Sequence, residues 1–302
     1  MHYTRFIIGW ASAVGLLSLK SMAFSQSLKQ TIVILTPQEY LAEKEKWVVL
    51  DARDSGFEEG HLPQAQPWPW HKLRESSSWD WIKVKDRNQY KGFVSKNKRE
   101  IESELTQLGL GEGKGVLIYG SPKQFGTESR VAWNFLYWGV KRVGLLDGGW
   151  ERWKKEGLPI SNQKNLPASP GKPFEVRFQE ERRMVSETLL NQYQKIDVFD
   201  ARTLPEYEGK SIHGERTGGR IPGAKHLDYK SLYDHDGNFL SKSDFLKRLG
   251  SFSLGPTVVS YCTGGVRSSL LVILYEYYTG KIMKNYDGSM WEWSSLPNAP
   301  LQ

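Results

Sequence analysis

Cysteine is almost absent from this sequence: its 302 residues include a single one, Cys262. One thiol cannot form an intramolecular disulfide, so the fold must be stabilised by its hydrophobic core. A free cysteine is either buried as a small apolar residue or retained for its reactivity, and the count alone leaves both open. The 6 histidines show no spacing typical of metal ligands, so we expect no metal centre and no cofactor.

Long apolar runs are also missing, apart from one near the start. Arg5 precedes an apolar segment at residues 6–19, and the small residues Ala23 and Ser25 are typical of a leader cleavage site. The run is shorter than the roughly 20 residues that span a bilayer, which favours a secretory signal over a membrane anchor. We expect residues 1–25 to direct export to the periplasm and the mature chain to make no stable membrane insertion.

Neither sign of charge dominates. Lys and Arg total 41 and Asp and Glu 34, for a net charge of +7, and the two signs are interleaved along the chain. This distribution is typical of a solvated surface, so we expect no nucleic-acid partner, although the excess would favour a small anionic substrate. The length allows two domains of ordinary size or one large one, the 39% hydrophobic content suits a soluble globular protein, and we expect a monomer.

The chain repeats itself. An apolar run ending in Asp-Ala-Arg, a turn, a second apolar run and a Trp-rich closing segment occur twice in the same order. They lie at residues 47–53 and 196–202, 61–65 and 220–224, 116–119 and 257–261, and 146–153 and 286–293. This order indicates two copies of one domain. Residues 161–173, rich in Pro and polar residues, are typical of a linker. We therefore expect domains at 26–160 and 174–302.

Within the second copy, helical patterns alternate with short apolar runs. We expect helices at 186–195, 244–249 and 266–278, and strands at 196–199 and 257–261. Ser241 and Asp244 resemble a capping box, and Gly280 would end the last helix. Such alternation predicts an α/β fold in which each domain has a parallel central sheet flanked by helices. Ligands bind beyond the carboxyl ends of such strands, where Cys262 lies.

The segment that follows Cys262 is Thr-Gly-Gly-Val-Arg, and a helix comes next. Gly264 and Gly265 permit backbone conformations that other residues avoid, so successive N–H groups can turn inward and form an anion-binding concavity. The amino end of the helix and the charge of Arg267 also favour an anion. All three effects should lower the pKa of Cys262 and make it a nucleophilic thiolate.

These features together resemble the rhodaneses, the thiosulfate sulfurtransferases. The loop from Cys262 to Arg267, the Asp-Ala-Arg strand end, the Arg-Ile-Pro-Gly-Ala turn and the closing segment all match that family. So does a tandem arrangement in which only the second domain keeps the cysteine. In the first copy Gly120 takes the place of Cys262, so that domain cannot carry a persulfide. We expect it to pack against the second domain and wall the cleft.

The resemblance implies a double displacement. Cys262 attacks the outer sulfur of thiosulfate, sulfite leaves, and the resulting persulfide passes its sulfur to cyanide or a thiol. The resemblance makes Cys262 the catalytic residue. The substrate-binding residues that it implies are Thr263, Gly264, Gly265, Val266 and Arg267. Asp200 and Arg202 are further candidates, although in the family they more often brace the structure than touch substrate.

Three alternatives stay open. Members that use 3-mercaptopyruvate carry a substrate-binding Arg where this sequence has Glu206, which argues against that donor. Phosphatases that share this fold have a longer loop between the Cys and the Arg, which argues against phosphate. A persulfide carrier or binding module that serves one protein partner would need the same loop. The nearby residues His213, Arg216, Arg220 and His226 are expected at the surface.

Overall fold

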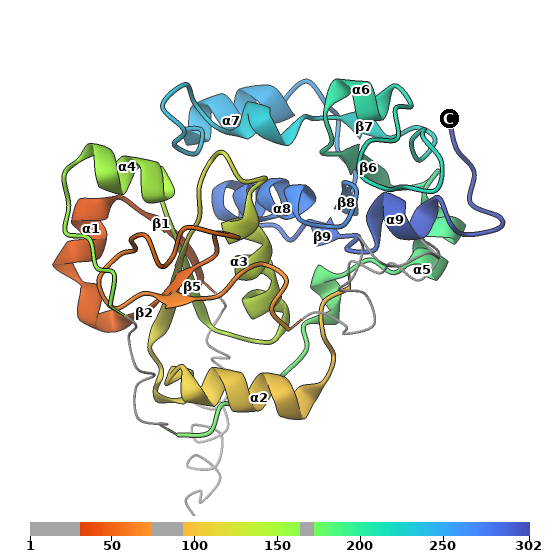
Figure 1. Ribbon diagram of the computed structural model, residues 1–302. Helices are drawn as coiled ribbons and strands as arrows, with labels where there is room; N and C mark the ends of the chain where they lie inside the picture. Colours follow the sequence, from red (N-terminus) through yellow and green to blue (C-terminus); the bar gives the residue numbers. More distant parts are fainter. Residues whose placement is uncertain (1–30, 74–92, 164–171) are drawn as a thin grey trace, which may run out of the picture.

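We describe the fold from a computed structural model, which describes residues 31–73, 93–163 and 172–302. Two parallel sheets, each flanked by helices, lie in the two halves of the molecule (Figure 1). The predicted α/β fold with two tandem domains is therefore confirmed. The predicted signal at 1–25 lies outside the described residues. None of the helices in the described ranges is long and apolar enough to cross a membrane.

The first sheet has the strand order β1-β5-β4-β2-β3, and its strand pairs are parallel. Its strands are β1 (Thr31–Leu35), β2 (Trp47–Asp51), β3 (Gln66–Pro67), β4 (Gly115–Tyr119) and β5 (Arg142–Leu146). The helices around it are α1 (Pro37–Ala42), α2 (Lys98–Gln107), α3 (Thr127–Tyr137) and α4 (Gly149–Lys155). The strand β4 is buried along its whole length, as a central strand covered on both faces must be.

The second sheet has the order β7-β6-β8-β9, again with parallel pairs. Its strands are β6 (Asp197–Asp200), β7 (Lys225–His226), β8 (Val258–Tyr261) and β9 (Lys284–Asn285). Its helices are α5 (Ser186–Gln192), α6 (Leu204–Tyr207), α7 (Lys242–Leu249), α8 (Arg267–Thr279) and α9 (Ser289–Trp293). In each sheet the strand formed by the run that ends in Asp-Ala-Arg pairs with the strand formed by the second apolar run of the repeat: β2 pairs with β4, and β6 pairs with β8.

The predicted helices and strands of the second copy are present, with ends shifted by a few residues. Ser241 accepts a hydrogen bond from the backbone N–H of Asp244 and so caps α7, as its sequence predicts. Gly280 ends α8 in the left-handed region at φ 69°, a conformation that costs a glycine little. The helix predicted over residues 186–195 ends earlier, at Gln192.

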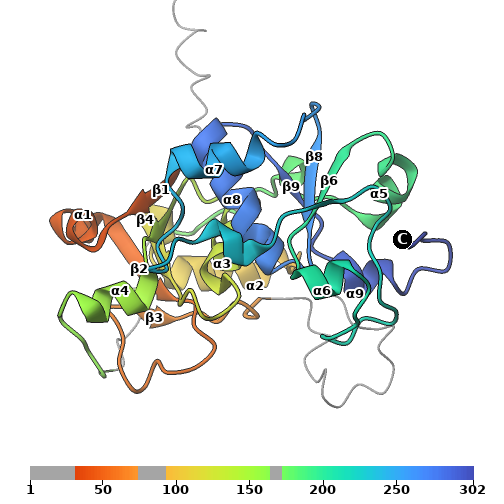
Figure 2. The same cartoon turned by 90° about the horizontal axis from the view of Figure 1, so that it is seen from above.

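One large hydrophobic cluster spans both domains, and each domain also has a smaller cluster of its own. Helices α3 and α8 lie side by side between the sheets in both views (Figures 1 and 2). Phe135 of α3 and Leu271 of α8 belong to the same buried cluster, and neither has any exposed surface. Helices that are buried on every side need partners on every side. Each domain therefore supplies part of the other's core, which fixes how the two sheets are oriented.

The chain that follows the predicted linker first runs along the first domain. The backbone N–H of Phe174 donates to the Thr106 hydroxyl at 2.9 Å, and that of Gln179 donates to the Tyr137 carbonyl at 2.8 Å. These contacts attach residues 174–179 to α2 and α3 before the chain enters the second sheet. The domain boundary at residue 174 stays a prediction.

Candidate active site

The loop between β8 and α8 lies at the carboxyl end of the second sheet, and Cys262 is its first residue. Gly265 has a φ of 79°, in the left-handed region that favours glycine. Gly264 is not in that region, contrary to the expectation that both glycines serve backbone conformation. A Cβ at Gly264 would lie 1.7 Å from the Trp291 ring. Gly265 is thus required by its backbone and Gly264 by close packing.

The thiol of Cys262 is enclosed, with 1% of the residue exposed. Burial raises the pKa of this thiol, but the charge of Arg267 and hydrogen bonds from the N–H groups of Ser268 and Gly264 and from the Ser268 hydroxyl lower it. The net effect is a pKa below the ordinary value of a cysteine. Two backbone amides and the start of α8 therefore face the sulfur; the Gly264 amide belongs to the predicted loop, whereas Ser268 lies one residue beyond it. The Ser268 hydroxyl also donates to the Asn285 amide oxygen at 2.7 Å.

Arg267 is close to the sulfur, but its guanidinium is occupied by Glu206. Its Nη1 and Nη2 donate to the two carboxylate oxygens of Glu206, each at 2.7 Å, and Nη2 also donates to the Thr263 hydroxyl at 2.5 Å. Burial raises the pKa of Glu206. The hydrogen bonds and ion pair with Arg267 and the hydrogen bonds from Thr203 outweigh burial and lower the pKa to about 2. Glu206 is therefore an anion at any ordinary pH.

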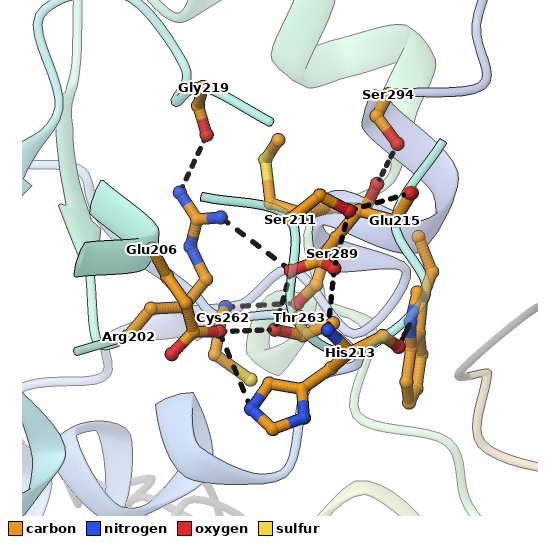
Figure 3. A network of polar contacts seen from close by, with 12 residues as sticks. Arg202, Glu206, Ser211, His213, Glu215, Gly219, Cys262, Thr263, Ser289 and Ser294 are labelled. Carbon is orange, nitrogen blue, oxygen red and sulfur yellow. Dashed lines mark hydrogen bonds and ion pairs between the residues drawn. The ribbon is translucent and has the colours of Figure 1, made fainter. Parts of the chain in front are cut away.

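A polar network extends from Glu206 and Thr263 toward the surface (Figure 3). The Thr263 hydroxyl also lies 3.5 Å from a carboxylate oxygen of Glu215, which in turn accepts from the backbone N–H of His213 at 2.9 Å. The His213 side chain is 40% exposed, and its Nε2 lies 3.9 Å from Glu206. The network thus runs from the buried loop to a histidine at the surface.

Asp200 and Arg202, the two further candidates, form a buried ion pair next to Tyr261, the residue that precedes the loop. Arg202 donates from Nε and Nη2 to the Asp200 carboxylate, and from Nη2 to the Gly219 carbonyl at 2.8 Å. The Tyr261 hydroxyl donates to Asp200 at 2.7 Å. Neither Asp200 nor Arg202 has exposed surface in this structure. Buried charges persist when they are paired and hydrogen-bonded, and here the pair fixes the residue that precedes Cys262.

The remaining sequence-predicted residues lie around the same loop. Val266 is buried at the amino end of α8 and Thr263 is 3% exposed. The nearby residues expected at the surface divide into two groups. His213 and Arg216 are exposed, as expected, whereas the expectation was wrong for Arg220 and His226, which are half-buried. His226 is held there because its Nε2 contacts the Arg202 carbonyl at 2.8 Å.

The first domain contributes to the entrance of the site. Phe125, 48% exposed, lies 6.3 Å from the ring of His213 and 6.3 Å from the ring of Tyr229, measured between ring centroids. Tyr229 belongs with Cys262 and Ala201 to one small buried cluster. An aromatic side chain of the first domain therefore lies beside two residues near the loop that begins at Cys262.

The first domain has the same Tyr–Asp–Arg contacts as the second but no cysteine. Tyr119 donates to Asp51 at 2.6 Å, and Asp51 pairs with Arg53, as in the second domain. After Tyr119 comes Gly120, and a Cβ at that position would lie 2.3 Å from a carboxylate oxygen of Glu128. A carboxylate thus occupies the space beside the position that the cysteine has in the other domain.

Three contributors to the site were not expected from the sequence: Ser268, Glu215 and Phe125. A hydroxyl residue in the first turn of α8 is a local signal that could have identified Ser268. The other two come from distant parts of the chain, and no local pattern marks them. Within the described ranges, no group of three or more His, Cys, Asp or Glu residues could hold a metal ion.

A parallel sheet whose carboxyl edge places a cysteine of lowered pKa against backbone amides at the start of a helix is typical of α/β proteins that use a cysteine thiolate. The family described as Rhodanese-like domain matches this chain twice, at residues 36–156 and 186–296. The chain therefore belongs to the rhodanese family, and with it to the sulfurtransferases. The first match covers strands β2 to β5 of the first sheet, and the second covers all four strands of the second sheet.

Two curated relatives are similar over most of the chain. "Sulfur carrier protein TtuD" of Thermus thermophilus is 30% identical over 263 residues, which cover 81% of this chain and 86% of that protein. "Thiosulfate sulfurtransferase" of Corynebacterium glutamicum is 29% identical over 209 residues, 66% of this chain and 69% of that protein.

Solved structures show the same fold. The crystal structure of YnjE superposes with a TM-score of 0.73 at 24% identity, covering 89% of this chain and 67% of that one. An anaerobic ergothioneine biosynthesis enzyme from Chlorobium limicola, in complex with trimethyl histidine, gives a TM-score of 0.71 at 19% identity, covering 91% of this chain and 65% of that one. At such identities the likeness concerns the fold alone.

Proposed function

We propose that this chain transfers sulfane sulfur from thiosulfate to a thiol or cyanide through a persulfide on Cys262. The observation that supports this most is the environment of the sulfur. Arg267, two N–H groups and a hydroxyl lower its pKa despite complete burial. An inert buried cysteine would have its pKa raised instead. The same donors would stabilise the anionic persulfide, as an oxyanion hole stabilises its intermediate.

The proposed reaction has two steps, formation of the persulfide on Cys262 and transfer of its outer sulfur to the acceptor. In the first, the Cys262 thiolate attacks the outer sulfur of thiosulfate, the S–S bond of thiosulfate breaks, and sulfite leaves with the bonding electron pair. In the second, cyanide or a thiolate attacks the outer sulfur of the persulfide, and the Cys262 thiolate is regenerated. The N–H groups of Gly264 and Ser268 lower the pKa of the attacking Cys262 thiol and so favour the thiolate that the first step needs.

The test is turnover with the two small substrates. Purified protein with thiosulfate and cyanide should form sulfite and thiocyanate in equal amounts. Phosphate release from an aryl phosphate, with no sulfite formed from thiosulfate, would favour the phosphatase alternative instead. The four residues between Cys262 and Arg267 argue against it. 3-Mercaptopyruvate is the alternative donor, and a higher rate with it than with thiosulfate would replace thiosulfate in the proposal.

A second candidate is a sulfur carrier that loads Cys262 and discharges it to one protein partner. Two observations favour it: a relative carries the name sulfur carrier protein, and Cys262 is 1% exposed. A persulfide that resists cyanide but disappears on adding a fractionated cell extract would support the carrier. Rapid discharge by cyanide would support the enzyme.

We further propose that residues 1–25 are an export signal and that the mature protein is a periplasmic monomer that does not bind membranes. The basis is the sequence of that segment. Expression of the full chain, followed by fractionation and mass measurement, tests this proposal. A shortened chain in the periplasmic fraction supports export. A full-length chain in the cytosol would contradict it.

A further inference from the structure

The guanidinium that should attract a sulfonate is already bound by a carboxylate. Two of its nitrogens donate to Glu206, and the pair is almost fully buried, with Arg267 5% exposed and Glu206 0%. A bidentate pair of this geometry is the arrangement that Arg forms with sulfate-like and carboxylate groups in general. Glu206 therefore occupies the position on Arg267 that an anionic substrate would otherwise take.

The other charges near the loop do not replace that attraction. Arg202 is likewise held by Asp200, and its Nη1 lies 4.0 Å from a second carboxylate, Glu215. Glu215 in turn lies against Thr263. Arg130 donates to the Gly265 carbonyl at 3.1 Å and shares Asp287 with Arg183. The arginines around the loop are thus matched by an equal number of carboxylates: Arg130, Arg183, Arg202 and Arg267 against Asp200, Glu206, Glu215 and Asp287. The fixed charges next to Cys262 do not sum to a positive field.

Arg267 still acts on the sulfur through its charge while its guanidinium donors are bound to Glu206, and the other positive groups that face the sulfur are backbone amides. The N–H groups of Gly264 and Ser268 and the amino end of α8 carry partial charges, and together these suit a single negative charge. A persulfide carries one such charge. Thiosulfate brings two, and the second has no uncompensated guanidinium to meet.

We infer that Glu206 is a specificity-determining residue: it lowers kcat/KM for sulfur donors with two negative charges relative to donors of lower charge. This inference rests on the proposed function, because it concerns the same transfer to Cys262. Glu206 acts through Arg267 and through its own charge, and it need not touch the reacting sulfur. The donors that it favours are singly charged or neutral compounds with a transferable outer sulfur, such as thiosulfonates and organic persulfides.

Two donors isolate the effect of charge. Thiosulfate and methanethiosulfonate both present an outer sulfur on a sulfonyl group, but the first carries two negative charges and the second one. The thiolate of Cys262 takes the outer sulfur from either, and sulfite or methanesulfinate leaves with the bonding pair. Differences in nucleophilicity between protein variants affect both reactions in the same way, so the ratio of the two kcat/KM values reports charge preference.

The experiment compares Glu206→Gln with wild type. The amide keeps the size of the side chain and an oxygen for Arg267 but removes the charge. We expect the thiosulfate-to-methanethiosulfonate ratio of kcat/KM to rise about tenfold, since a unit charge several ångströms away at a partly buried site has an effect of this order. An unchanged ratio in the folded variant would overturn the inference.

A matched control is available in the first domain. Thr36 and Glu39 form the same capping box at the start of α1 that Thr203 and Glu206 form at the start of α6. Glu39→Gln removes the same group from the same local motif outside the site. It should leave the ratio unchanged. A change as large as that of Glu206→Gln would show that the effect does not come from the site.

The proposed function and the inference fail in different ways. If neither donor loads wild-type Cys262, the proposed function is wrong. If both load but Glu206→Gln leaves their ratio unchanged, only the inference is wrong. Should that variant fail to fold, wild type provides the test through protection of Cys262 from iodoacetamide. The monoanion methanesulfonate should protect Cys262 at least as well as the dianion sulfate. If sulfate protected at a tenfold lower concentration than methanesulfonate, the inference would be contradicted.

Discussion

The hydroxyl of Tyr233, in the second domain, donates a 2.8 Å hydrogen bond to the carboxylate of Glu128, in the first. This contact joins the two pseudo-equivalent sites. Glu128 lies over Gly120, where the first domain lacks its cysteine, and Tyr233 packs against the cluster that contains Cys262. Burial raises the pKa of Glu128 to about 7, although hydrogen bonds from its own N–H and from Tyr233 lower it.

That raised pKa predicts a pH dependence of stability. Between the ordinary carboxyl pKa of 4.5 and about 7, the folded protein holds a proton on Glu128 that the unfolded chain has lost. The free energy of unfolding should therefore fall as pH rises through this window, by on the order of 1 to 3 kcal/mol from this residue. Glu128→Gln should flatten the wild-type slope between pH 5 and 7, measured by urea unfolding. Parallel slopes in the two proteins would contradict the assignment.

Ser268→Ala should make Cys262 less reactive. The variant loses a hydroxyl that lowers the pKa of Cys262 and also donates to the Asn285 amide oxygen at 2.7 Å, but it keeps the N–H of the same residue. Because that one proton is shared, we expect alkylation near neutral pH to slow by about three- to tenfold, less than the full worth of a hydrogen bond to a charged group. The measurement is the rate of iodoacetamide modification against pH, and the apparent pKa should move upward. Ser269→Ala is the control, because its hydroxyl donates to the Gly265 carbonyl instead. Equal effects of the two variants would point to loop distortion.

Phe125→Ala should make Cys262 more accessible to large reagents. The ring covers His213 and Tyr229 from the first domain, so its removal should speed reaction of Cys262 with a bulky maleimide several-fold. The rate with the small reagent iodoacetamide should change little. Equal acceleration of both reagents would mean that the substitution loosens the site generally. No acceleration of either would mean that Phe125 does not limit access.

Gly264→Ala should disrupt the loop, because the added methyl group would lie 1.7 Å from Trp291. Overpacking of this kind costs about 1 to 3 kcal/mol, and sulfur loading should fall sharply. Gly255→Ala is the control, since its Cβ would meet only the Asp197 carboxylate, at 3.4 Å. Thermal unfolding of the two variants measures the difference. Similar midpoints, together with normal sulfur loading by the Gly264 variant, would contradict the packing argument.

Much of the fold could be predicted because it is encoded locally and twice. The apolar runs that end in Asp-Ala-Arg became β2 and β6, and the second apolar runs became their neighbours β4 and β8. The position of Cys262 after a buried strand placed it at the carboxyl edge of the sheet. The backbone amides that face its sulfur could be expected from Gly265 and from the start of the following helix. These are relations between residues close in the sequence.

The unpredicted parts are relations between distant residues. The sequence marks Glu206 as a departure from one kind of substrate site, but its pairing with Arg267 crosses 61 positions. Phe125 reaches the entrance from the other domain, and no periodicity encodes a contact between two folded units. Gly264 was assigned a conformational role, whereas the Trp291 ring explains it. Burial and long-range pairing decide such points, and only the folded chain shows them.

Intact-mass measurement of the purified protein before and after thiosulfate tests the central claim most directly. We predict that wild type gains one sulfur atom and loses it on addition of cyanide, and that Cys262→Ser, which removes only the sulfur nucleophile, folds normally and gains none. A mass unchanged by thiosulfate in wild type, or the same cyanide-sensitive gain in Cys262→Ser, would contradict the proposal that Cys262 carries the transferred sulfur.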